Sequence, residues 1–140
     1  MSVRVIGVLA IAAALGAGAA GSAAGETQQV AVPGGAYADV SAHELATVLV
    51  KKDFTLLNVH VPYEGEIAGT DLFIPFDAIA STAKLPADRA APLVVYCRSG
   101  RMSAIAARAL VGSGYTNVRN VAGGMIAWER AGYPLRHERR

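Results

Sequence analysis

The chemistry suggested by this sequence centres on its single cysteine. Cys97 follows the apolar run LVVY over Leu93 to Tyr96, which is typical of a strand buried in a parallel sheet. An alanine-rich segment over 102–111 predicts a helix soon after it. Because ligands of open parallel sheets bind at the carboxyl ends of the strands, Cys97 stands where a site is expected.

The residues after Cys97 favour its ionised form. The first turn of a helix presents free backbone amides and a positive partial charge, which attract an anion. Arg98 and Arg101 add positive charge, and Gly100 permits a tight turn that lets successive amides point at the sulfur. The thiolate is the nucleophilic form of cysteine, so this segment predicts nucleophilic sulfur chemistry.

A purely structural role for Cys97 is the alternative, since free cysteines are among the most buried residue types. The flanking arginines and Gly100 favour chemistry, because packing requires neither. One cysteine excludes an internal disulfide, a CxxC pair and a multi-thiolate metal site on this chain. His43 and His137 have no ligand-like spacing with each other or with Cys97, so we expect no metal site and no cofactor.

Length and composition limit the class of protein. A chain of 140 residues predicts one domain, and 53% hydrophobic with 17% charged residues excludes both a disordered chain and a polytopic membrane protein. The net charge is only +2, and three of the cations fall at the C-terminal end, at Arg136, Arg139 and Arg140. A nucleic-acid partner is therefore not indicated.

The first residues have the pattern of a targeting segment. Arg4 precedes an uncharged apolar run from Val5 to Gly21, and small residues follow it. This order predicts a signal peptide over 1–24 and an exported, periplasmic or extracellular protein. An uncleaved anchor is the alternative, and contact with a membrane is expected only in that case.

The remaining chain predicts one folded unit. We expect a linker over 25–36, a domain over 37–135 and a basic tail over 136–140. Strand-like and helix-like segments alternate, which favours a small parallel α/β sheet. The expected strands are Tyr37–Val40, Thr55–Val61, Leu93–Tyr96 and Asn117–Val121. The expected helices run from a capping box at Ser41 and Glu44 to about Lys52, over Met102–Val111 and over Gly124–Ala131.

Four segments together resemble one family. They are CRSGRM over 97–102, LLNVHVP over 56–62, IPFDAI over 74–79 and VAGGMIAWERAGYPL over 121–135, and they resemble the motifs of rhodanese-type sulfurtransferases. The resemblance implies a five-stranded parallel sheet with helices on both faces. It also implies a ping-pong reaction in which the Cys97 thiolate takes the outer sulfur of a donor such as thiosulfate.

In that reaction a persulfide on Cys97 passes its sulfur to a thiol or a protein acceptor. The resemblance assigns substrate binding to Arg98, Ser99, Gly100, Arg101 and Met102. Residues expected to support the loop are Asn58, His60 and Ser103. Export limits the acceptor, because thiols outside the cytosol tend to be oxidised.

The sequence departs from the family at two places. Asn58 and His60 replace a common Asp-x-Arg pair, so Asn58 keeps a capacity to brace a loop by hydrogen bonds without a charge. Glu66 stands about where many members carry histidine. These changes affect the identity of the donor more than the fold.

Two other functions remain open at this point, as does the oligomeric state. One is a non-catalytic module that binds an anion or a partner in the same pocket. The other is a phosphatase or an arsenate reductase of related fold. A phosphatase loop of the Cys-x5-Arg type requires arginine at position 103, where this chain has Ser103.

Overall fold

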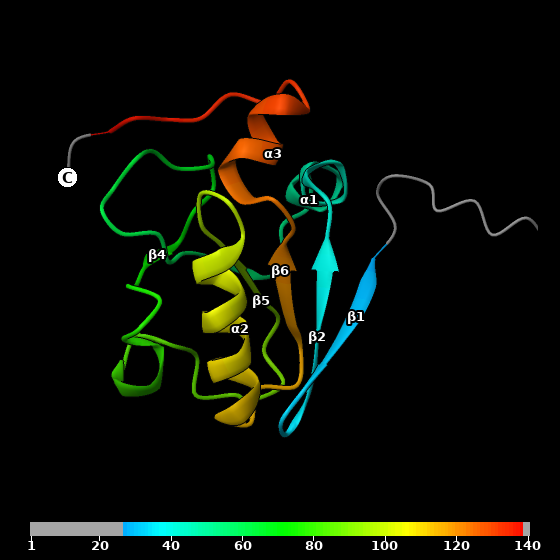
Figure 1. Cartoon of the computed structure of the whole chain (residues 1–140), viewed down its shortest axis with the longest axis vertical. Helices are drawn as coiled ribbons and strands as arrows, with labels where there is room; N and C mark the ends of the chain where they lie inside the picture. Colours follow the sequence, from blue (N-terminus) through cyan, green and yellow to red (C-terminus); the bar gives the residue numbers. More distant parts are fainter. Residues whose placement is uncertain (1–26, 139–140) are drawn as a thin grey trace, which may run out of the picture.

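A six-stranded sheet forms the centre of the molecule, with the strand order β1-β2-β6-β5-β3-β4. The computed structural model describes residues 27–138. The strands are β1 (Gln28–Val32), β2 (Gly35–Val40), β3 (Thr55–Asn58), β4 (Leu72–Phe73), β5 (Leu93–Tyr96) and β6 (Val118–Val121). From β2 to β4 all neighbouring strands are parallel, which confirms the predicted parallel sheet, and β1 adds an antiparallel strand at one edge (Figure 1).

Helices cover both faces of the sheet, as predicted. The helices are α1 (Ala42–Leu49), α2 (Arg101–Gly112), α3 (Gly124–Arg130) and a short 3-10 helix, η1 (Ile79–Ser81). Buried side chains alternate between two clusters, because successive residues of a strand point to opposite faces. Leu57 and Val95 pack with α2 and η1 on one face, whereas Leu56 and Val94 pack with α1 and α3 on the other.

The first helix and the third strand end earlier than the sequence predicted. The capping box at the start of α1 is confirmed, because the Glu44 amide donates to Ser41 Oγ at 3.0 Å and the Ser41 amide donates to Glu44 Oε2 at 3.2 Å. The helix then ends at Leu49 rather than near Lys52. Strand β3 ends at Asn58 rather than Val61, because the Asn58 side chain accepts the amide of His60 and turns the chain.

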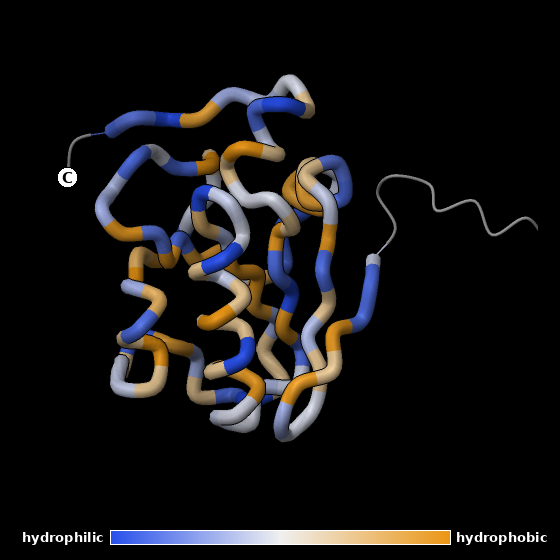
Figure 2. The backbone as a smooth tube through the Cα atoms, in the orientation of Figure 1, coloured by the Kyte–Doolittle hydropathy of each residue, from blue (hydrophilic) through white to orange (hydrophobic). Residues whose placement is uncertain are grey.

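The predicted linker over 25–36 is wrong for its described part. Residues 28–32 form β1, which pairs with β2 through a tight turn at Pro33 and Gly34. Val30 and Val32 pack against the cluster under α2, and Figure 2 shows β1 changing from hydrophilic at its start to hydrophobic towards the turn. The alternation of polar and apolar residues over five residues is too short to predict this pairing from the sequence.

The boundary of the predicted basic tail is also wrong. The backbone of Arg136 pairs with that of Glu66 in an antiparallel bridge, with N–O distances of 2.8 and 2.7 Å. The amide of Glu138 then donates to the Tyr63 hydroxyl at 3.0 Å. The chain end therefore lies as a strap across residues 63–66, visible at the top of Figure 1 as the red segment beyond α3.

The predicted signal segment over 1–24 lies outside the described residues, as do Arg139 and Arg140. Within residues 27–138, no helix has the length and apolar character needed to cross a membrane.

Candidate active site

Cys97 lies at the carboxyl end of β5, in the middle of the sheet, where the sequence placed it. Its side chain is only 1% exposed and belongs to the apolar cluster under α2. The sulfur nevertheless has polar partners, because the Gly100 amide donates to Sγ at 3.0 Å and the Ser103 hydroxyl approaches it at 3.4 Å. Both donors would stabilise a thiolate at this position.

Helix α2 begins directly over this cysteine with unsatisfied amides. Gly100 is its N-cap, with φ of 101° in the left-handed region, and supplies no side-chain cap. The first helical hydrogen bond runs from the Ala104 amide to the Gly100 carbonyl oxygen at 3.1 Å. Among residues 27–138, no atom accepts a hydrogen bond from the amides of Arg101, Met102 or Ser103. Such a terminus is suited to hold an anion.

The expected ring of amides around the sulfur is therefore only partly present. Of the amides over 98–102, that of Gly100 reaches Sγ, and the Ser103 hydroxyl provides the second donor. The amides of Arg101 and Met102 remain available to a group bound above the sulfur.

The start of α3, at Gly123 and Gly124, lies behind the cysteine loop and holds it by backbone hydrogen bonds. The sequence motif contains both glycines but does not show their role. The Met125 amide donates to the Cys97 carbonyl oxygen at 2.9 Å, and the Ile126 amide donates to that of Arg98 at 3.0 Å. A Cβ at Gly124 would collide with the Cys97 carbonyl oxygen and lie 2.7 Å from that of Arg98. Only glycine allows the two backbones to approach so closely. Adjacent glycines before an apolar helix were the signal in the sequence.

Asn58 braces the loop that follows β3. It is buried, its Nδ2 donates to the Gly65 carbonyl oxygen at 3.0 Å, and its Oδ1 accepts the His60 amide at 3.0 Å. The two bonds use both ends of the amide, which a carboxylate could not do. These bonds brace the loop over 59–65, and neither reaches the cysteine loop, so a role for Asn58 in supporting the cysteine loop stays a prediction.

Tyr96, immediately before the cysteine, fixes residues 67–70, which follow the loop braced by Asn58. Its hydroxyl accepts the Ile67 amide at 3.0 Å and lies 2.7 Å from Thr70 Oγ1. Burial raises the pKa of Tyr96 to about 12, so its hydroxyl keeps its proton at neutral pH. Sequence reasoning treated this tyrosine only as a strand residue.

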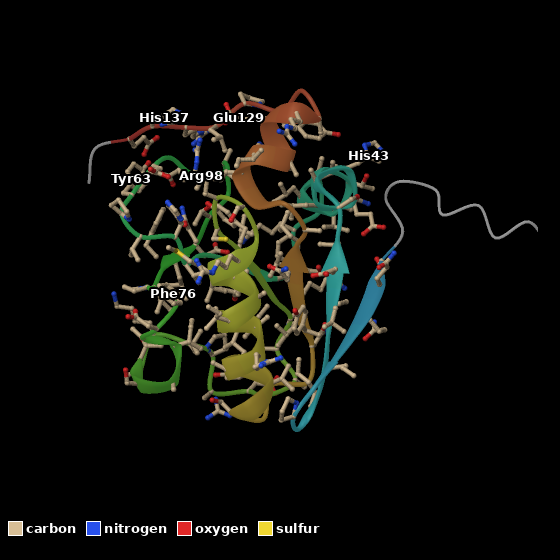
Figure 3. All side chains as sticks on the ribbon, in the orientation of Figure 1. His43, Tyr63, Phe76, Arg98, Glu129 and His137 are labelled. Carbon is tan, nitrogen blue, oxygen red and sulfur yellow. The ribbon has the colours of Figure 1, made fainter. Side chains whose placement is uncertain are left out.

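A chain of charged and polar side chains lies beside the loop. His60 Nε2 is 2.7 Å from Glu64 Oε2, and the Nε of Arg98 is 3.6 Å from the same oxygen. The sequence singled out His60 and Arg98 but missed Glu64, which connects them. Figure 3 shows Arg98 in the same corner of the molecule as Tyr63 and His137.

The other predicted substrate residues have different surroundings. Arg101 and Ser99 are exposed, whereas Met102 is half-buried and packs against the cluster that contains Cys97. A cavity of about 700 Å³ is lined by residues that include Asn58, His60, His137 and Glu138, and no residue of 97–103 lines it. No group of three metal-binding side chains occurs within the described part of the chain.

A cysteine at the carboxyl end of a parallel strand, followed by a helix with no side-chain cap, lies here in an α/β domain of the rhodanese type. The chain belongs to the rhodanese-like domain family, whose pattern matches residues 58–131. It is 38% identical over 88 residues to a protein named sulfurtransferase from Allochromatium vinosum, covering 60% of this chain and 79% of that protein.

Solved structures agree with this family. A rhodanese-related protein from Thermoplasma volcanium has a TM-score of 0.61 and 31% identity, over 71% of this chain and 98% of that one. A human structure described as the single-domain sulfurtransferase TSTD1 has a TM-score of 0.59 and 26% identity, over 66% of this chain and 95% of that one.

Replacing Gly124 by alanine should displace the cysteine loop. The new Cβ combines left-handed strain of about 1–2 kcal/mol with overpacking of about 1–3 kcal/mol, so we expect a loss of about 3 kcal/mol in the free energy of unfolding. Urea unfolding measures this loss. Gly132→Ala is the matched control, because Gly132 also has positive φ, at 91°, but nothing lies within 4 Å of its added Cβ. Equal losses in both variants would contradict the proposed contact.

Replacing Asn58 by aspartate should destabilise this chain even though the family commonly has aspartate there. The carboxylate keeps the bond from the His60 amide but cannot donate to Gly65, so two oxygens face each other in a buried place. We expect a loss of about 1–3 kcal/mol at neutral pH, measured by urea unfolding. Asn117→Asp, at a half-buried site just before β6, controls for the added charge. A stability equal to the parent would show that Asn58 does not brace the loop.

Proposed function

We propose that this protein is a sulfurtransferase that carries a sulfur atom on Cys97 as a persulfide. The observation that carries the proposal is the geometry at the sulfur, which receives the Gly100 amide at 3.0 Å under a helix end with further free amides. The names of the similar proteins support the same class of reaction. Thiosulfate is the donor that we propose.

The first half-reaction transfers the outer sulfur of the donor. The Cys97 thiolate attacks that atom, a sulfur–sulfur bond forms on the protein, and the sulfur–sulfur bond of thiosulfate breaks with its electron pair leaving on sulfite. No external oxidant or reductant is needed. The free amides of Arg101 and Met102 would hold the added sulfur, while Arg98 and Arg101 attract the donor and stabilise the departing sulfite.

The second half-reaction restores the thiolate. A nucleophilic acceptor, either a thiolate or another thiophile, attacks the outer sulfur of the persulfide and carries it away. The sulfur of Cys97 leaves as the anion that the Gly100 amide and Ser103 hydroxyl already stabilise. Within this chain no second cysteine can compete for the persulfide, because Cys97 is the single cysteine.

Incubation with thiosulfate should add one sulfur atom to the protein. Intact mass measurement tests this directly, and Cys97→Ser should show no addition. Protein alkylated at Cys97 before the incubation is a second control. If the thiol of Cys97 can be titrated but the protein gains no sulfur, the proposed sulfurtransferase activity is wrong. The function would then be that of a non-catalytic binding module.

We further propose that the protein works outside the cytosol, on the basis of the uncharged run over 5–21 behind Arg4. Expression of the full chain followed by N-terminal sequencing of the protein recovered outside the cytosol should give a start near residue 25. Recovery of the intact chain from the cytosolic fraction alone would overturn the proposed export.

A further inference from the structure

We infer that Glu64 is a specificity-determining residue that lowers the preference of the site for doubly charged sulfur donors. The inference rests on the proposed function, since it concerns the donor that Cys97 attacks. The carboxylate of Glu64 repels an anionic donor, whereas Arg98 and Arg101 attract it.

The contacts of Glu64 place its charge at the rim of the loop. Its Oε2 lies 3.6 Å from the Nε of Arg98, the residue next to Cys97, and its side chain is 42% exposed. The same oxygen lies 2.7 Å from Nε2 of His60, whose side chain is only 11% exposed. The contact with the more buried His60 holds the carboxylate near Arg98.

The two arginines of the loop therefore differ in their surroundings. Arg98 has a carboxylate partner, whereas Arg101 forms no ion pair with any residue of the range 27–138. A negatively charged donor meets the full charge of Arg101, whereas Glu64 offsets part of the charge of Arg98. The sequence alone predicted the same role in donor binding for both arginines, because it could not show which of them lies near Glu64.

The solvent exposure of Glu64 and Arg98 limits how strongly Glu64 affects the binding of a donor. Both side chains of the Arg98–Glu64 pair are about half exposed, so solvent screens the interaction and the effect on binding is modest. The interaction of Glu64 with a donor is proportional to the charge of that donor. Loss of Glu64 should thus stabilise the binding of a dianion by twice the free energy by which it stabilises the binding of a monoanion. The fold increase in kcat/KM for the dianion should therefore be the square of the fold increase for the monoanion.

Two donors of matched chemistry test this relation. Thiosulfate is a dianion, and an alkanethiosulfonate presents the same outer sulfur on a sulfonyl group with one negative charge. The kcat/KM for each donor is measured with cyanide as the common acceptor, from the thiocyanate formed. In a ping-pong reaction this constant reports the first half-reaction alone, so the acceptor does not affect the comparison.

For Glu64→Gln we expect roughly a twofold rise with the thiosulfonate and a fourfold rise with thiosulfate, both diminishing as salt is added. Glu64→Ala should give the same ratio, which guards against an effect of the new amide. Asp53→Asn is the matched control, because Asp53 is an exposed carboxylate before the amino end of β3, and the cysteine loop follows the carboxyl end of the parallel neighbour β5.

The outcomes separate the inference from the function on which it rests. Equal changes with both donors, or a fall with both, would overturn the inference and make Glu64 a structural residue, while the parent protein still transfers sulfur. If Asp53→Asn changed the ratio of the two kcat/KM values by a similar factor, the inference would also be overturned, because a general change of surface charge would then explain the result with Glu64. If the parent protein takes sulfur from neither donor, the proposed function fails and the inference fails with it.

Discussion

The close approach of α3 to the cysteine loop is the constraint on which the site depends. The amides of Met125 and Ile126 hold the carbonyl groups of Cys97 and Arg98, and the absence of a side chain at Gly124 lets them do so. With its carbonyl groups fixed behind it, the loop turns its Gly100 amide forward to the sulfur. Two backbone hydrogen bonds thus fix the carbonyl side of the loop, while its Gly100 amide donates to the sulfur.

The site divides into an inner part made of backbone and an outer part made of charged side chains. Beside the inner part, the Asn58 side chain donates to Gly65 and the Tyr96 hydroxyl accepts the Ile67 amide, and these buried hydrogen bonds hold the loop that follows β3. The outer part, with Arg98 and Glu64, is partly exposed and screened by solvent. Such an arrangement separates the groups that contact the sulfur from the charged side chains at the rim.

Sequence reasoning located the strand, the cysteine and the helix of the site because their signals are local. The apolar run LVVY matches β5 residue for residue, and α2 begins one residue before the predicted start. The edge strand β1 could not be found in the same way, since its stability comes from pairing with β2 and from Val30 and Val32 packing on α2. Glu64 was missed for a similar reason, because its partners are set by the path of a loop rather than by spacing along the chain.

The strap formed by the chain end has a practical consequence for handling the molecule. Its Arg136 backbone is joined to Glu66, two residues from the carboxylate at the rim, and Glu138 is joined to Tyr63. A purification handle, dye or solid support attached beyond Glu138 would crowd the cavity that His60, His137 and Glu138 line. Attachment ahead of β1, on the sheet edge opposite β4, would leave that cavity uncovered.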